Sequence, residues 1–102
     1  MKIRTLERLG ATPHNKPIPG AETNRRPDGQ MPSGQYVEVK SGGTVSNTNQ
    51  VKEMGKAAMK ATGQPLLIGT TNPDVKVTRQ VRNNPNVVVR PVPTEKTSEQ
   101  RQ

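Results

Sequence analysis

Three charged residues, Asp28, Glu38 and Lys40, have types and a spacing that could support chemistry at a metal ion. Glu38 and Lys40 belong to a stretch in which polar and apolar side chains alternate, as in a β-strand, so both should lie on one face of it. Carboxylate oxygens bind hard divalent cations. An adjacent ammonium group can stabilise negative charge that develops on a substrate. The pattern therefore favours a site with acidic groups for a divalent cation and a positive charge beside them.

The turn at residues 32–34 decides whether Asp28 can reach Glu38. It is typical of a three-residue hairpin loop with glycine in the left-handed position. A loop of this kind pairs Gln30 with Tyr36 and Asp28 with Glu38, whose Cβ atoms would then be roughly 4.5–5.5 Å apart. Like charges in this position repel each other, and a bound divalent cation removes the repulsion. A bulge would shift this register by one residue.

The order of these residues carries a resemblance to a known family. Pro27-Asp28, a turn, and Glu38-Val39-Lys40 in a strand followed by a helix look like the motif of the PD-(D/E)XK nuclease superfamily. The resemblance covers the motif and, more loosely, the element order of residues 22–90. It implies a restriction-endonuclease-like α/β core, with a small mixed sheet flanked by helices, and a metal-dependent endonuclease.

The resemblance also implies roles for the residues of the motif. Asp28 and Glu38, with the backbone carbonyl of Val39, would hold Mg²⁺, with Mn²⁺ or Zn²⁺ as alternatives. Lys40 would orient the attacking water or stabilise charge on the phosphate. Whether Lys40 also acts as a general base is left open, since an ammonium near a metal stays charged unless it is strongly desolvated.

Three residues outside the motif are further candidates. An early helix in the family often donates another acidic residue to the metal site, which here would be Glu7 or Glu22. A glutamine on the helix after the motif strand often faces the site, which suggests a catalytic role for Gln50. Each has an ordinary alternative: a surface carboxylate for the two glutamates, and a helix cap for Gln50.

The composition indicates one small domain and favours a polyanionic partner, with solubility alone as the other explanation of its charge. The 102 residues include only 27% hydrophobic residues and one aromatic residue, Tyr36, so the core must be thin. We predict a single nuclease-like domain over residues 1–93 and a disordered tail over residues 94–102. The formal net charge of +8 favours a nucleic acid as the partner.

Basic residues on either side of the motif could bind phosphates. Arg25 and Arg26 directly precede it, and Lys52, Lys56 and Lys60 recur at every fourth position of a predicted helix. A solvated basic surface is the alternative for both groups. The charge does not distinguish DNA from RNA.

Several functional classes are excluded by what the chain lacks. There are no cysteines, so no disulfide framework or thiolate site is expected, and the single histidine, His14, excludes a histidine-rich zinc site. No apolar run is long enough for a transmembrane helix or a signal-peptide core, so no membrane segment is predicted.

Periodicity predicts two main helices. The first covers residues 1–9 and ends at Gly10. The second covers residues 47–62, with Asn47 as its N-cap and Gly63 after its last turn. Its apolar positions should face a sheet: Val51, Met54, Ala58 and Ala61.

The remaining elements complete an α/β order. Residues 65–70 and 86–90 are short apolar runs typical of buried strands. Residues 11–23 are predicted to be a loop and residues 41–46 a flexible connector. Residues 75–82 have an ambiguous period, and we favour a short helix with a strand as the alternative. The order is helix, hairpin, helix, strand, short helix, strand, around a mixed sheet.

A compact basic domain with one motif is similar in style to the C-terminal toxin domains of contact-dependent growth inhibition and related polymorphic toxin systems. That similarity implies a nuclease exported as part of a larger protein, acting on DNA or tRNA in the cytoplasm of a target bacterium and neutralised by a cognate immunity protein. The alternative class is a non-catalytic basic module that binds nucleic acid or a protein. A third is a structural or chaperone-bound fragment of a larger chain.

Overall fold

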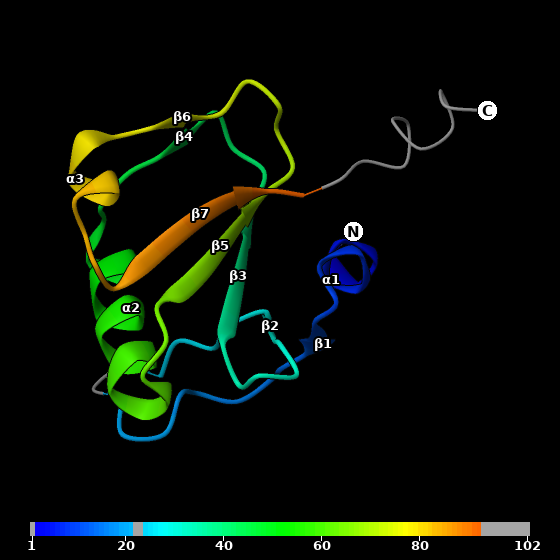
Figure 1. Cartoon of the computed structure of the whole chain (residues 1–102), viewed down its shortest axis with the longest axis vertical. Coiled ribbons are helices and arrows are strands. Elements are labelled where there is room, and N and C mark those ends of the chain that lie inside the picture. The colour runs from blue at the N-terminus through cyan, green and yellow to red at the C-terminus, as the bar shows by residue number, and fades with distance from the viewer. Residues whose placement is uncertain (1, 22–23, 93–102) are drawn as a thin grey trace.

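One mixed sheet of five strands, in the order β1-β2-β3-β5-β7, forms the centre of the molecule (Figure 1). The computed structural model describes residues 2–21 and 24–92. Neighbouring strands are antiparallel from β1 to β3 and parallel from β3 to β7. The strands are β1 (Thr12–Pro13), β2 (Gly29–Gln30), β3 (Tyr36–Lys40), β5 (Leu66–Thr70) and β7 (Val87–Pro91). A mixed sheet within an α/β domain was predicted, and this part of the prediction is confirmed.

In the described part of the chain, three helices and a small second sheet surround the central sheet. Helix α2 lies on one side of the sheet and helix α1 on the other (Figure 1). The helices are α1 (Lys2–Leu9), α2 (Asn49–Thr62) and α3 (Arg79–Arg82), and the second sheet pairs β4 (Thr44–Val45) with β6 (Lys76–Val77). Among the described residues, no helix is long and apolar enough to cross a membrane.

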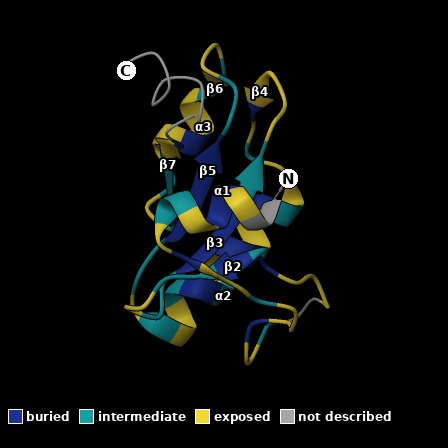
Figure 2. Ribbon diagram, turned by 90° about the vertical axis from the view of Figure 1, so that its right-hand side faces the viewer, coloured by how far each residue is buried: buried dark blue, intermediate teal, exposed yellow. Residues whose placement is uncertain are grey.

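Strand alternation divides the core into two layers. On β3, Tyr36 belongs to the cluster that packs against α2, and Val37 belongs to the cluster around Leu6 of α1. On β5, Ile68 faces α2 and Leu67 faces α1. Figure 2 shows the buried strands between the two helices. Because side chains alternate along a strand, Glu38 lies on the same face as Tyr36, under α2.

The hairpin between β2 and β3 has the predicted register. Gly29 is opposite Val37 and Gln30 is opposite Tyr36. Gly34 has φ 97°, the left-handed conformation that the loop requires and that a side chain would disfavour. The ladder therefore contains no bulge, and the position opposite Glu38 is that of Asp28.

Helix α2 matches the prediction except at its first turn and on one position of its buried face. Its N-cap is Thr48, whose hydroxyl accepts the N–H of Val51 at 3.2 Å, so the prediction of Asn47 was wrong. The side chain of Asn47 instead accepts a hydrogen bond from Asn84 at 3.1 Å. Ala61 is exposed, because it lies at the margin of the buried stripe of Val51, Met54, Gly55 and Ala58.

Short strands account for the other differences. The predicted loop 11–23 contains β1, and the predicted connector 41–46 contains β4. Residues 75–82 hold both alternatives in turn, the strand β6 and then the helix α3. Two-residue strands show no periodicity in a sequence, because they form through pairing with a distant segment. The tail 94–102 lies outside the described residues.

Candidate functional site

Asp28 and Glu38 are held against each other by the backbones of their two strands. The N–H of Asp28 donates to Glu38 Oε1 at 3.3 Å, and the N–H of Val39 donates to Asp28 Oδ2 at 2.8 Å. Each carboxylate thus accepts a backbone hydrogen bond from the other strand. The predicted juxtaposition of the two carboxylates is therefore present in the structure.

The end of strand β2 explains why Asp28 is available for this contact. The β2–β3 ladder begins at Gly29, so the N–H of Val39 has no backbone partner on β2 and takes the Asp28 side chain instead. A Cβ at Gly29 would lie 2.5 Å from a methyl carbon of Leu6 and 2.8 Å from the carbonyl oxygen of Thr12. Glycine at this position lets β2 lie close to both β1 and α1, and so places Asp28.

Glu38 is buried and holds its proton more strongly than an ordinary glutamate. Its exposed fraction is 8%. The pKa of Glu38 is raised from 4.5 to about 7, mainly by burial and in addition by the negative charge and hydrogen bonding of the Asp28 carboxylate. The charge of Lys40 and the backbone N–H of Asp28 act in the opposite direction. A cation between the two carboxylates would offset the negative charge of Asp28 and so lower the pKa of Glu38.

Gln50 reaches this pair from the first turn of α2. Its Nε2 donates to Glu38 Oε2 at 3.2 Å. Since Thr48 caps the helix, the predicted capping-box role of Gln50 is not present. The structure instead brings Gln50 to the carboxylate pair, the placement that the family resemblance implied.

Lys40 and the backbone of Val39 complete the surroundings of the pair. Lys40 is half-buried, two positions beyond Glu38 on the same strand face, and opposite Thr70. The carbonyl of Lys40 accepts the N–H of Thr71, so its backbone faces β5. Alternate residues of a strand direct their N–H and C=O groups to opposite edges. The carbonyl of Val39 therefore points to the edge where Asp28 lies.

The other acidic candidates do not join this group. Glu7 is exposed on α1, and the buried Leu6 of that helix packs on the sheet face opposite to Glu38. Within residues 2–21 and 24–92, no group of three or more His, Cys, Asp or Glu side chains could hold a metal ion together. The structure thus does not bring Glu7 to the carboxylate pair, and Glu22 lies outside the described residues.

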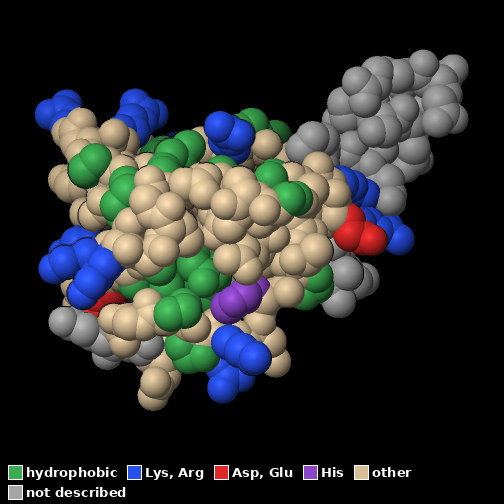
Figure 3. Space-filling model, turned by 60° about the horizontal axis from the view of Figure 1, so that its bottom comes forward, with side chains coloured by type: hydrophobic (Ala, Val, Ile, Leu, Met, Phe, Trp, Pro, Cys, Tyr) green, Lys and Arg blue, Asp and Glu red, His purple; other side chains and the backbone are tan. Residues whose placement is uncertain are grey.

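The predicted phosphate-binding residues lie on the surface, three of them on α2 and two in the segment before β2. Lys52, Lys56 and Lys60 are exposed, and Arg25 lies 3.9 Å from Glu53 in an ion pair between half-exposed side chains. Arg26 is exposed and donates to the side chain of Asn15 at 3.5 Å. Figure 3 shows lysine and arginine side chains spread over one face, on which acidic side chains are few.

His14 was given no role by the sequence, yet it lies beside the site. Its backbone N–H donates to the carbonyl of Asp28 at 3.0 Å, and its ring packs edge-on against Tyr36 with centroids 5.1 Å apart. Its Nδ1 atom is buried and has no hydrogen-bond partner among the described residues. His14 lies beside Asp28 because β1 pairs with β2, and no local pattern in the sequence predicts that pairing.

Comparisons with known proteins add no family to this geometry. Searches against protein-family models, curated proteins and solved structures find no significant match to the chain. The functional inference therefore depends on the chemistry of the site itself.

Proposed function

We propose that this protein is a metal-dependent nuclease that hydrolyses phosphodiester bonds of DNA or tRNA at the Asp28–Glu38 pair. The observation that carries the proposal is a buried glutamate that the fold holds against a second carboxylate, with Gln50 of α2 donating to it. A buried carboxylate in contact with a second, half-buried one destabilises a protein unless a proton or a cation is shared between them. Such an arrangement is expected where the carboxylates have a function.

The available donor atoms suit a hard divalent cation. Each carboxylate oxygen that accepts one N–H keeps a second lone pair for a metal. Asp28, Glu38 and the Val39 carbonyl would supply only oxygen ligands, which Mg²⁺ prefers and Mn²⁺ accepts. Bound there, the cation would polarise the scissile phosphate and lower the pKa of a water molecule.

The surrounding residues have distinct tasks in this proposal. The N–H of Val39 fixes the orientation of Asp28, and the amide of Gln50 fixes that of Glu38. The ammonium of Lys40 stabilises negative charge that builds on the phosphate during attack. Preorganised donors of this kind contribute most where water is excluded, and the burial of Glu38 provides such surroundings.

We further propose that the domain has the core of a restriction-endonuclease-like nuclease. An antiparallel hairpin carries the motif, its second strand continues into a parallel three-strand unit, and the helix after it covers the motif face. This is the element order that the resemblance implied. The coarser α/β architecture does not depend on this proposal.

Cleavage assays with isosteric variants test the function. Purified protein is incubated with plasmid DNA and, separately, with total tRNA, in Mg²⁺, Mn²⁺, Zn²⁺ or EDTA. We expect metal-dependent cutting that Glu38→Gln and Asp28→Asn reduce by about 10³-fold or more, since each removes a metal ligand. Asp74→Asn, which makes the same change at an exposed turn residue, should keep full activity.

The alternative, a non-catalytic basic module, predicts a different result. If the folded protein binds nucleic acid but cuts neither substrate with any of the metals, the nuclease proposal is refuted. If Glu38→Gln cuts as well as the natural protein, the assignment of the site is wrong.

A further inference from the structure

A groove with a volume of about 280 Å³ lies along the outer face of α2, beside the segment 18–21. In Figure 1 the early part of the chain passes next to the lower turns of α2. The groove is separate from the carboxylate pair, and neither carboxylate lines it. Its lining residues are Gly20, Ala21, Asn49, Lys52, Glu53, Lys56, Ala57 and Lys60.

The wall of this groove is anchored to the core. Ile18 is 2% exposed and belongs to the same buried cluster as Val51 and Met54 of α2. The N–H of Ala21 bonds to the carbonyl of Ile18 at 3.0 Å and closes a turn there. Because the wall is fixed by a buried side chain and a backbone hydrogen bond, the groove exists before any ligand arrives.

The charges in the groove are arranged for a phosphate chain. Lys52, Lys56 and Lys60 follow one another at intervals of four residues, which is a rise of about 6 Å per step along a helix. That rise is close to the separation of neighbouring phosphates along one polynucleotide strand. The single acidic residue of the lining, Glu53, already has the guanidinium of Arg25 at 3.9 Å. The groove therefore presents a row of positive charge with little opposing charge.

Neighbouring residues at the start of α2 contribute to the groove and to the carboxylate pair. Asn49 lines the groove, and the next residue, Gln50, donates to Glu38. A strand lying along the lysines would thus leave the groove next to the proposed site of cleavage. Its methyl-lined floor at Ala21 and Ala57 offers contact to sugars, and no described aromatic side chain lines it to stack bases.

We infer that this groove binds three consecutive phosphates of one extended polynucleotide strand, so that the substrate is a single-stranded segment of nucleic acid. This inference rests on the proposed function and names its substrate class. Gly20 and Ala21 flank the row of lysines, so the proposal assigns the groove to one strand and not to both strands of a duplex. Recognition goes through the backbone, so binding is largely independent of sequence.

Salt dependence of binding tests the inference without cleavage. A fluorescent single-stranded oligonucleotide and a hairpin duplex are titrated with protein in EDTA over a range of salt concentrations. Each phosphate contact to a single strand contributes about −0.7 to the slope of log K against log salt. We expect Lys52→Gln, Lys56→Gln and Lys60→Gln together to reduce the single-strand slope by about 2, and to weaken duplex binding less.

A matched variant controls for lost net charge. Lys16→Gln, Lys76→Gln and Arg79→Gln together remove the same charge from exposed positions outside the groove, and should change the slope by less than half as much. An equal loss in both triple variants, or tighter binding of the duplex than of the single strand, would overturn the inference. Circular dichroism checks that both triple variants are folded. Replacing the three lysines should not disrupt α2, because like charges four residues apart weaken a helix.

The failure of this inference can be told from failure of the nuclease proposal. Glu38→Gln should keep the single-strand slope of the natural protein while it loses cutting, because Glu38 lies outside the groove. If no cutting is found but the lysine variant loses the slope, the groove stands and the catalytic proposal does not. If cutting is found and the lysine variant keeps the slope of the natural protein, the nuclease proposal stands and the groove inference does not.

Discussion

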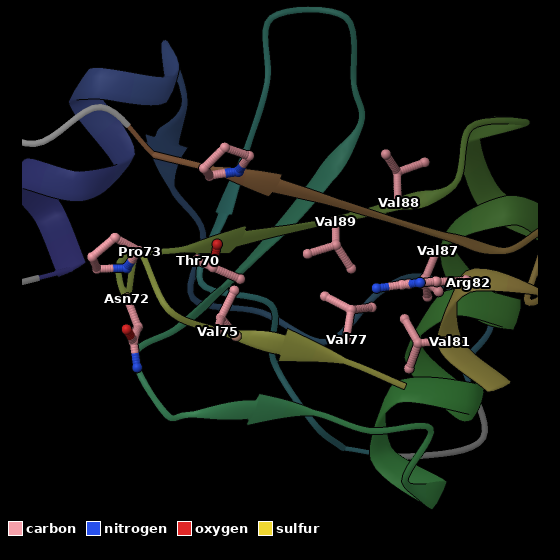
Figure 4. A pocket seen from close by; sticks show the side chains of 11 residues that line it. Thr70, Asn72, Pro73, Val75, Val77, Val81, Arg82, Val87, Val88 and Val89 are labelled. Carbon is pink, nitrogen blue, oxygen red and sulfur yellow. The ribbon is translucent and has the colours of Figure 1, made fainter. Parts of the chain in front are cut away.

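Two regions on the same face of the sheet differ in what their side chains can do. Under the start of α2, strand β3 presents Glu38 and Lys40 to its surroundings. At the other margin, β7 with β6 and α3 encloses a pocket of about 540 Å³ (Figure 4). The side chains of Val77, Val81, Val87 and Val89 are directed toward it in that view.

If the proposed function holds, pocket size is a poor guide to the functional site of this molecule. The valine pocket is larger than the groove along α2, but among the residues that line it Arg82 is the only charged one. Its valines lower the free energy of the fold by removing apolar surface from water, about 25 cal/mol per Å². The buried Glu38 does the opposite, because burial raises its pKa and so disfavours its charge at neutral pH. A buried group that lowers stability, such as Glu38, is a better indication of function than a cavity whose lining side chains stabilise the fold.

The edge of the valine pocket also carries a feature that discourages pairing with another strand. β7 is the last strand of the sheet, and it ends in Pro91. Proline lacks the N–H that an added strand would need, and edge strands of natural sheets often carry it. We therefore take the valine pocket as the margin of the core, and the following predictions separate it from the charged region.

The largest contrast is expected from removing the ammonium of Lys40. Lys40→Gln should lower the rate of phosphodiester cleavage by about 10²–10³-fold, because it removes a positive charge that stabilises the transition state. Lys76→Gln, on β6 beside the valine pocket, should leave the rate within twofold. Initial rates with saturating Mg²⁺ measure both. Equal losses in the two variants would contradict the assignment of Lys40.

The second contrast concerns pH and stability. The folded-state pKa of Glu38, about 7, is above its ordinary value of 4.5, so the folded state binds a proton more tightly than the unfolded state. Its contribution is fully present below pH 4.5 and is lost as the pH rises through 7. We expect the free energy of unfolding to fall by up to about 3 kcal/mol across this range.

The comparison variant for this measurement is Glu38→Gln. It cannot titrate, so the difference between the two urea-unfolding profiles isolates Glu38 from the other carboxylates. Excess Mg²⁺ at pH 8 should stabilise the natural protein and have little effect on the variant, since only a ligand bound to the folded state shifts unfolding. Parallel pH profiles for the two proteins would show that Glu38 is not the group responsible.

The charged region was more predictable from the sequence than its surroundings. Alternation over β3 and the glycine of the turn fix the register of the hairpin, and that register brings Asp28 to Glu38. These signals are local, because a strand period and a turn conformation depend on neighbouring residues alone. The role of a metal there, and cleavage itself, stay predictions.

What the sequence did not reveal depends on contacts between distant segments. The burial of Glu38 requires α2 to pack over β3, and the position of His14 requires the pairing of β1 with β2. Glycine disfavours a helix, so the sequence gives no reason for Gly55 in α2. The reason is its close packing against β7, because a Cβ at Gly55 would lie 2.8 Å from a methyl carbon of Val87. The N-cap was predicted one residue too early, because asparagine and threonine are both good N-cap residues. Which of the two caps α2 depends on where the helix begins in the folded chain, and there the hydroxyl of Thr48 accepts the N–H of Val51.

The smallest effect is expected in the valine pocket. Val89 is half-buried on β7, and Val89→Thr replaces a methyl group by a hydroxyl of similar size. Threonine suits a strand, and the pocket leaves its hydroxyl partly in contact with water, so we expect a loss of about 0.5–1 kcal/mol in stability. For a domain of this size that is a fall of roughly 4–8 °C or less in melting temperature, measured by circular dichroism. The cleavage rate should not change, because strand β5 lies between β7 and β3 and its Ile68 separates Val89 from Glu38. A tenfold loss of cleavage with an unchanged melting temperature would mean that substrate reaches the valine pocket, and the two regions would then be parts of one site.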